Sequence, residues 1–182
     1  ILQEYNLPTI DAHAALQPDV IGIGDDWGDE RQTLVAPDLW RRFWKPRYKA
    51  MCDRIHGYGA KVHFHCDGHI LAILEDLIEI GVDIINPQAS VMPLAELSAA
   101  LRGRICVMPD TDRRGVMQKG SRTQVVEHLH ALWDAFWTPA GGLIIALSTE
   151  GYGKTLDQVR WSFEAMDEFN RSNGYGPKRM TR

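Results

Sequence analysis

The feature that most constrains the fold is the alternation of short apolar runs with longer stretches of helical periodicity. Five runs are rich in β-branched and apolar residues, at 19–23, 61–65, 83–86, 104–108 and 142–147. Parallel strands covered on both faces have this character, whereas half-exposed strands alternate polar and apolar residues. The pattern therefore predicts βαβ units and a parallel sheet. Five units cannot close an eight-stranded barrel of about 250 residues, so an open sheet and part of a barrel are both possible.

The segments between these runs have the three-to-four-residue spacing of amphipathic helices. Helices are expected over residues 1–16, 37–55, 70–80 and 156–170, and another follows Ser121, which is a suitable N-cap. Gly81 is expected to end its helix in the left-handed conformation. In the last helix, Val159, Phe163 and Met166 are expected to face inward. Residues 1–170 form one predicted domain, and 171–182 form a polar tail.

Composition limits the classes of partner. The net charge is −4 and no basic tract is present, which argues against nucleic-acid binding. No apolar run approaches the roughly 20 residues that span a bilayer, so no membrane association is expected. The chain has three cysteines with no paired spacing, a pattern that favours reduced thiols and a cytoplasmic location.

Each predicted strand runs directly into a loop that carries polar or charged residues. The carboxyl ends of parallel strands converge on one face, where α/β enzymes place their active sites. The sequence therefore predicts a functional site at this face rather than a merely solvated edge. Its candidate residues, in chain order, are Asp25, Asp26, Trp27, His65, Asp67, Asn86, Asp112, Arg113 and Glu150.

Two of these loops allow more than one interpretation. His63 and His65 lie on the same side of a strand, where they either hold a metal with Cys66 or Asp67 or are simply buried and hydrogen-bonded. The Asp25–Asp26 pair is either a metal- or substrate-binding carboxylate site or a capping turn before the next helix. Trp27 lies in a strand-end loop, where it is expected to offer an aromatic wall to a ligand, whereas the other tryptophans lie in helical stripes.

The strand-end loops, taken together, resemble the uroporphyrinogen decarboxylase superfamily. The resemblance lies in three motifs and in their order: Asp25-Asp26-Trp27-Gly28, then His65-Cys66-Asp67-Gly68, then Gly81-Val82-Asp83-Ile84-Ile85-Asn86-Pro87. It extends from about residue 19 to residue 170. It implies a (β/α)₈ barrel, of which this chain holds the C-terminal portion of about five βα units, with roughly the first half of the domain absent.

The superfamily implies two activities. In its cobalamin-linked methyltransferases, a His-x-Cys motif and a distant Cys hold zinc, and a corrinoid carries the methyl group. His65 matches the first ligand, Asp67 replaces the first Cys, and the second Cys falls on Thr149 or Glu150. Such a harder site would hold Zn²⁺ or another divalent ion, with His65, Asp67 and Glu150 as ligands or catalytic groups. The alternative is a site without metal, in which His65 and Asp67 bind the substrate directly and Glu150 acts as a general base. The expected reaction moves a methyl group between a small methylated substrate and a corrinoid protein.

In this interpretation, Asp25, Asp26, Trp27, Asn86, Asp112 and Arg113 form the substrate-binding shell. The alternative activity is decarboxylation of a tetrapyrrole carboxylate, which needs no cofactor. The net acidic loops suit a polycarboxylate substrate less well. A non-enzymatic alternative is a truncated half-barrel that only binds a partner, such as the missing N-terminal half or a second copy of the chain.

Overall fold

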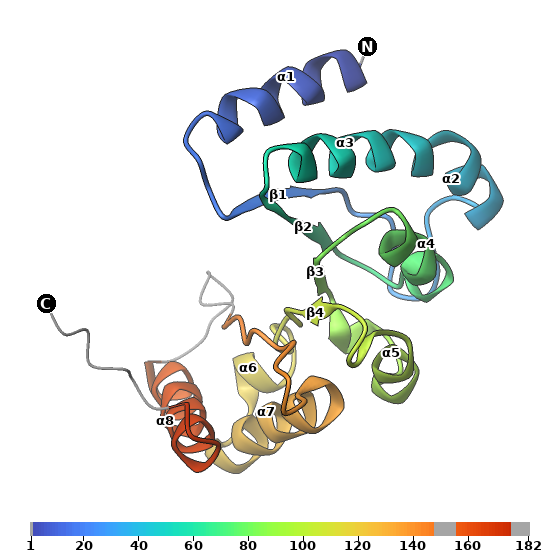
Figure 1. The fold of residues 1–182 in the computed structure, drawn as a ribbon. Helices are drawn as coiled ribbons and strands as arrows, with labels where there is room; N and C mark the ends of the chain where they lie inside the picture. Colours follow the sequence, from blue (N-terminus) through green and yellow to red (C-terminus); the bar gives the residue numbers. More distant parts are fainter. Residues whose placement is uncertain (1, 148–155, 176–182) are drawn as a thin grey trace, which may run out of the picture.

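The computed structural model describes residues 2–147 and 156–175, and in it helices form an arc around a curved parallel sheet (Figure 1). Strand and helix alternate along most of the chain, as predicted. The elements in chain order are α1 (Leu2–Ala14), β1 (Val20–Gly24), α2 (Pro37–Phe43), α3 (Lys45–Gly57), β2 (Lys61–Cys66), η1 (Leu71–Ile73), α4 (Leu74–Glu79), β3 (Ile84–Pro87), η2 (Ala89–Val91), α5 (Leu94–Leu101), β4 (Cys106–Val107), α6 (Val116–Lys119), α7 (Arg122–Phe136) and α8 (Leu156–Ser172).

The sheet has the strand order β1-β2-β3-β4, and all neighbouring strands are parallel. In β2, Val62, Phe64 and Cys66 are fully buried, while His63 and His65 are only partly buried on the opposite face. The helices therefore cover one face of the sheet, and the face that bears the two histidines corresponds to the interior of a barrel. The predicted parallel α/β architecture is confirmed.

The fifth predicted strand is the main departure in the sheet. Residues 142–147 form only isolated parallel bridges, from Val107 to Leu143 and from Asp110 to Ala146. Gly141 and Gly142 both have positive φ, near +93° and +94°, so the chain enters this segment in a conformation that a regular strand does not use. The segment lies in the place of a fifth strand and is hydrogen-bonded to β4, from the Val107 N–H to the Gly142 carbonyl at 2.8 Å and from the Ile144 N–H to the Val107 carbonyl at 2.9 Å, but its pairing is limited to isolated bridges.

The long helix predicted over 37–55 is wrong as a single element, because the chain divides it into α2 and α3. The break lies at Trp44, just before Lys45 and Pro46 at the start of α3. Proline has no N–H with which to continue the helical bonding and disfavours a helical residue before it. The apolar stripe nevertheless stays on one side, since Trp40, Tyr48 and Ile55 are all buried.

The helical pair α7–α8 forms a second small core beside the sheet. Ser121 caps α7 through a reciprocal capping box with Gln124, as its position predicts, and Trp133 stacks on Phe169 with ring centroids 4.2 Å apart. The inward face predicted for α8 is wrong at Phe163, which is 55% exposed. No helix in the described part of the chain is long and apolar enough to cross a membrane.

The buried face of α8 combines apolar and polar residues. Met166 packs against the second core, as expected, and Ala165 is buried in it. Gln158 and Ser162 are also buried, and the Gln158 amide donates to the Gly120 carbonyl at 3.2 Å while the Ser162 hydroxyl donates to the Gln158 carbonyl at 2.9 Å. A polar side chain that finds its partners can be buried at little net cost, so hydropathy alone does not identify these two positions.

Candidate metal centre at the strand ends

Three potential metal ligands converge on the open face of the sheet. They are Asp26, which follows β1, His65 at the end of β2, and Asp67 just beyond it. The His65 Nε2 atom lies 3.7 Å from Asp26 Oδ1 and 3.7 Å from Asp67 Oδ1, and one ligand atom from each residue lies within 4.8 Å of the others. Donors on one tetrahedral zinc, each about 2.1 Å from the ion, lie about 3.4 Å apart, so small adjustments would bring all three onto one ion.

The electrostatics of this cluster favour a cation. Asp67 Oδ1 is buried and has no hydrogen-bond partner among the described residues, although it lies opposite the His65 ring. A buried carboxylate oxygen without a partner is costly, and a coordinated cation is one way to satisfy it. One imidazole and two carboxylates form a donor set that suits Zn²⁺ and harder divalent ions better than it suits thiophilic ones. The residues present therefore fit a divalent metal ion.

The two ligand-bearing loops are held together by a close glycine contact. Gly68 has φ +87°, and a Cβ at that position would lie 2.0 Å from the carbonyl oxygen of Gly28. The contact is reinforced by hydrogen bonds from the Gly28 N–H to the Asp67 carbonyl and from the Asp67 N–H to Asp26 Oδ1. Only glycines allow this approach, and the approach brings Asp26 beside Asp67.

Further polar residues surround the cluster on the side of β3 and β4. The His65 Nδ1 atom lies 2.7 Å from Asn86 Oδ1, and Asn86 Nδ2 donates to Asp110 Oδ1 at 2.9 Å. Arg113 lies between two carboxylates, with a contact to Asp67 Oδ2 and one of 3.3 Å to Asp110 Oδ2. Asn86 and Arg113 were predicted at the site, and the structure brings both to it.

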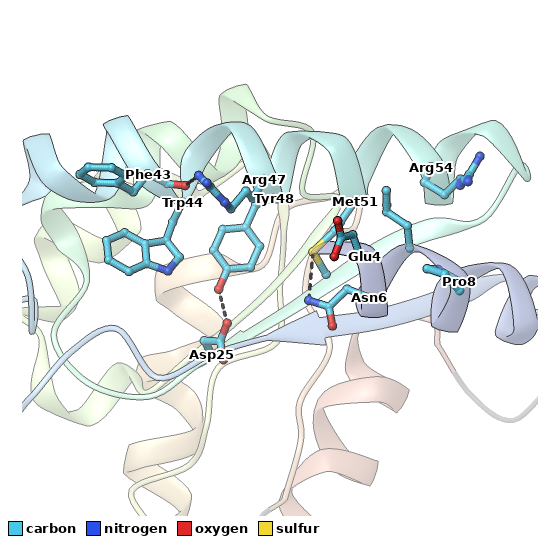
Figure 2. A pocket seen from close by; sticks show the side chains of 11 residues that line it. Glu4, Asn6, Pro8, Asp25, Phe43, Trp44, Arg47, Tyr48, Met51 and Arg54 are labelled. Carbon is cyan, nitrogen blue, oxygen red and sulfur yellow. Dashed lines mark hydrogen bonds between the residues drawn. The ribbon is translucent and has the colours of Figure 1, made fainter. Parts of the chain in front are cut away.

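The other aspartate after β1, Asp25, points away from the cluster. Asp25 accepts a hydrogen bond from the hydroxyl of Tyr48, which reaches it from α3 (Figure 2). Burial, followed by the neighbouring Asp25 carboxylate, raises the pKa of Tyr48, so the phenol stays protonated and donates to Asp25. Successive residues point in opposite directions, and only Asp26 of the pair joins the cluster of potential ligands.

Asp25 instead borders a cavity of about 870 Å³ between α1 and α3. It is lined by Glu4, Asn6, Leu7, Pro8, Asp25, Phe43, Trp44, Arg47, Tyr48, Met51 and Arg54 (Figure 2). A separate groove of about 500 Å³ lies on the open face of β1 and β2, bordered by Gly22, Gly24, His63 and His65 together with both aspartates. Asp25 therefore lies at the junction of the cavity and the groove.

Trp27 does not present a free aromatic wall as expected. Its ring packs against Trp40 and Trp44, with centroids 6.3 and 4.9 Å away, and its Nε1 donates to the Tyr48 hydroxyl at 3.0 Å. The indole therefore anchors the loop after β1 to α2 and α3. A strand-end position alone does not reveal whether an aromatic ring faces a ligand or the helix layer.

Cys66, one of the alternative metal ligands, faces away from the histidines. It is fully buried beneath the helices, and its Sγ accepts the Trp27 N–H at 3.2 Å. Burial raises the pKa of this thiol to about 12, which opposes formation of the thiolate that binds metals. The alternation of strand side chains places Cys66 on the opposite face from His65, so the interpretation with Cys66 as a ligand is wrong.

Asp112 lies next to Arg113 in the loop after β4, but its carboxylate is bound by the backbone of that loop. Its carboxylate accepts the backbone N–H groups of Gly115 at 2.9 Å, Val116 at 3.1 Å and Arg114 at 3.3 Å. Burial works against ionisation of Asp112, but these backbone hydrogen bonds outweigh it, and the pKa of the carboxyl group is lowered. Asp112 therefore orders the loop that leads into α6, and its oxygens do not line the predicted substrate wall.

The lowered pKa of Asp112 predicts a pH-dependent contribution to stability. Asp112→Ala is expected to lower the free energy of unfolding by about 1 kcal/mol at neutral pH, the size of a lost capping interaction. A depressed folded-state pKa stabilises the fold above the unfolded value of about 3.9 and loses that effect as pH falls through the folded value. The difference between wild type and variant, measured by urea denaturation, should therefore shrink in acid. The exposed Asp134→Ala serves as the control, and a difference that persists unchanged in acid would contradict this role.

Glu150, the third predicted ligand, and the neighbouring Thr149 lie outside the described residues. Asp110 was not singled out, although its side chain is only 13% exposed and pairs with Arg113. The available signal was its place next to Pro109, directly after β4. The family resemblance points to Asp112 instead.

Comparisons with known proteins agree with the fold. A family model described as uroporphyrinogen decarboxylase (URO-D) matches residues 2–169. No curated protein sequence matches significantly. A methyltransferase from Methanosarcina mazei superposes with a TM-score of 0.69 at 18% identity, covering 92% of this chain and 47% of that chain. A Yersinia pestis dihydropteroate synthase in a sulfonamide drug complex gives 0.52 at 16% identity, covering 89% and 62% respectively.

At these identities the structural similarities establish the fold alone, and the chain spans about half to two thirds of the two structures. They confirm that the parallel sheet with its helical layer is a portion of a barrel-type α/β fold. The match to the family model extends over nearly the whole chain and includes all the strand-end loops described above. The chain belongs to the uroporphyrinogen decarboxylase (URO-D) family.

Proposed function

We propose that Asp26, His65 and Asp67 bind a divalent metal ion, with Zn²⁺ as the first candidate, and that the metal serves methyl transfer. The observation that carries this proposal is the buried Asp67 Oδ1, which lies opposite the His65 ring and has no hydrogen-bond partner within the part of the chain that the structure describes. The predicted ligand set gains one member, since Asp26 joins His65 and Asp67. Glu150 remains a proposed additional ligand or general base, argued from the family resemblance alone.

The proposed reaction moves a methyl group between a small methylated substrate and a corrinoid carrier protein. The electron pair of the corrinoid's cobalt(I) forms the new bond to the methyl carbon as the C–O or C–N bond breaks, and the oxygen or nitrogen keeps the electron pair of the broken bond. A metal ion held here would act as a Lewis acid that stabilises this leaving atom. A site with two carboxylates and no thiolate suits methoxy or methylamine substrates better than thiol activation. His65, Asp67 and Asp26 would hold the ion, and the substrate would approach from the groove.

The groove on the open face of β1 and β2 is the proposed substrate site. Gly22 and Gly24 have no side chains to fill the space in front of His63 and His65. The groove ends at Asp26, one of the proposed metal ligands. A small neutral or cationic substrate suits this acidic rim, because like charges would repel an anion.

A partner that completes the barrel is part of the proposal. The chain spans 47% of the Methanosarcina mazei methyltransferase, and β1 is the outer strand of the described sheet. The cavity between α1 and α3 lies beside β1, where a further strand and its side chains would pack. The proposed occupant is an N-terminal half-barrel, and a second copy of this chain is the alternative.

The decarboxylase alternative gains less support from the site. A polycarboxylate substrate needs free cationic groups, but Arg113 is paired with Asp67 and Asp110. Arg114 pairs with Glu30 at 2.5 Å. Both arginines of the loop after β4 therefore already have carboxylate partners. Methyl transfer remains the first proposal.

A methyl-transfer assay tests this function. Zinc-loaded chain is mixed with cob(I)alamin and, in turn, methanol and mono-, di- and trimethylamine, and formation of methylcobalamin is followed by absorbance. We expect turnover with one of these probes and a loss of about 100-fold or more in His65→Ala, above the range of outer-shell changes. Native mass spectrometry of the same sample shows whether a second chain is present. Equal rates in wild type and variant would overturn the assignment, and an inactive wild type in a sample that does contain a second chain would favour the non-enzymatic half-barrel.

A further inference from the structure

Asn86 has every polar atom of its side chain committed to the protein. Its Nδ2 donates to the Met108 carbonyl at 2.5 Å and to Asp110 Oδ1 at 2.9 Å, and its Oδ1 lies 2.7 Å from His65 Nδ1. The side chain is buried, with the whole residue 7% exposed. Asn86 therefore offers little to a substrate, although it was predicted as a substrate-binding residue.

These contacts determine the orientation of the Asn86 side-chain amide group. Met108 O and Asp110 Oδ1 are both acceptors, so the amide nitrogen must face them. The amide oxygen must then face His65, and an oxygen can only accept. The His65 Nδ1 atom therefore carries the proton that it donates to Asn86.

The position of that proton has a consequence at the other ring nitrogen. In a neutral imidazole one nitrogen carries hydrogen and the other holds a lone pair. With Nδ1 protonated, the lone pair of His65 lies on Nε2, the atom 3.7 Å from both Asp26 Oδ1 and Asp67 Oδ1. Histidine ligands commonly depend on such a partner to fix the tautomer and the ring orientation.

The anchor of Asn86 is itself tied to the opposite side of the centre. Asp110 uses Oδ1 for Asn86 and Oδ2 for Arg113 at 3.3 Å, and Arg113 also contacts Asp67 Oδ2. A ring of contacts thus runs from His65 through Asn86, Asp110 and Arg113 to Asp67. Within this set of contacts, Arg113 binds Asp67 Oδ2. The other carboxylate oxygen, Oδ1, faces His65 and has no hydrogen-bond partner among the described residues.

We infer that Asn86 is a positioning residue that holds His65 in the Nδ1–H tautomer and so presents the Nε2 lone pair to a metal ion. The inference deepens the proposed function, because its purpose rests on the metal centre. The tautomer itself exists without metal and is measured separately. Asp110 and Met108 serve as the anchors that keep the amide in this orientation.

Nitrogen-15 NMR of the metal-free protein tests the inference. The spectra are recorded about two pH units above the ordinary side-chain pKa of histidine, about 6.5, where a histidine with that pKa is neutral. Wild type is expected to show His65 as the Nδ1–H tautomer. Asn86→Leu removes the acceptor at similar volume, so His65 should shift toward the Nε2–H form that free imidazole side chains favour. Asn86→Asp retains an acceptor for Nδ1–H but loses both donors to Met108 and Asp110, and the Nδ1–H tautomer should persist.

The pair of variants separates positioning from a merely structural role. If Asn86 had only a structural role, His65 would have the same tautomer in Asn86→Leu and Asn86→Asp. A wild-type protein with His65 in the Nε2–H form would overturn the inference outright. Asp112→Asn, in the same loop as Asp110, is the matched control and should leave the His65 tautomer unchanged.

Zinc affinity, measured by competition with a chelator, should fall roughly 10- to 100-fold in Asn86→Leu and less in Asn86→Asp. If wild type binds no zinc but shows the Nδ1–H tautomer, the proposed function fails while the positioning contact remains.

If Asn86→Leu does not fold, Asn86→Ser provides a smaller polar variant whose hydroxyl is too short to bridge His65 and Asp110. It should give a mixture of tautomers. An unchanged Nδ1–H signal in that variant would contradict the inference.

Discussion

His65→Ala is expected to abolish specific zinc binding, with affinity falling by more than about 100-fold. Removal of an outer-shell partner typically costs 10- to 100-fold, and a direct ligand contributes more than its partner does. His65 supplies the one nitrogen donor of the cluster, and without it the exposed Asp26 and the neighbouring Asp67 would remain as two carboxylates. Metal content after dialysis and competition with a chelator provide the measurement.

His63→Ala is the matched control for this experiment. His63 lies on the same face of the same strand, two residues away, and its Nε2 has no hydrogen-bond partner among the residues that the structure describes. It does not belong to the cluster of converging ligand atoms, so zinc affinity should change by no more than a few-fold. Equal losses in the two variants would show that the effect is not specific to the proposed ligand.

Gly68→Ala is expected to destabilise the chain by about 3 kcal/mol and to weaken zinc binding with it. The left-handed conformation at φ +87° costs a non-glycine residue about 1–2 kcal/mol. The added methyl group would also lie 2.0 Å from the Gly28 carbonyl oxygen, and overpacking against backbone costs a further 1–3 kcal/mol. Relief of that clash would separate the loops that carry Asp26 and Asp67.

Gly59→Ala isolates the contribution of the close contact. Gly59 also has positive φ, +80°, but a Cβ there would meet no atom within 4 Å. Its substitution should cost about 1 kcal/mol, from the backbone conformation alone, and should leave zinc affinity unchanged. Urea denaturation of both variants gives the comparison. Equal destabilisation would mean that the Gly28–Gly68 approach has no energetic weight.

Much of the fold could be predicted because local rules and the final packing agree. The strand–helix alternation, the shared face of His63 and His65, the cap at Ser121 and the positive φ at Gly81 follow from periodicity and backbone preference. The break between α2 and α3, just before Lys45 and Pro46, could also have been inferred from the missing N–H of proline. The apolar stripe across that break concealed it, because both short helices bury the same side.

The site was predictable as a region but not atom by atom. Loops that follow parallel strands must converge, which places His65, Asp67 and Asn86 together. Which carboxylate of the Asp25–Asp26 pair joins them depends on Tyr48, whose hydroxyl reaches Asp25 from another element. Likewise, the sequence does not distinguish the role of Asp112 from that of Asp110, because the backbone N–H groups that occupy Asp112 cannot be read from residue types.

The same distinction separates fold from chemistry in this family. The parallel strand order and close contacts such as Gly28–Gly68 belong to the fold and bring the strand-end loops together. The proposed reaction depends instead on two or three donor atoms at those loops. By the family resemblance, Asp67 takes the place of a thiolate ligand of the methyltransferases, and we propose that this exchange changes the metal preference and the substrate class.

X-ray absorption spectroscopy of the zinc-loaded wild-type chain tests the central claim most directly, because it reports the ligand atoms themselves. The proposed centre predicts only nitrogen and oxygen neighbours at about 2.0–2.2 Å, including the multiple-scattering signature of one imidazole. A sulfur neighbour at about 2.3 Å would place a cysteine in the coordination sphere and contradict the site formed by Asp26, His65 and Asp67.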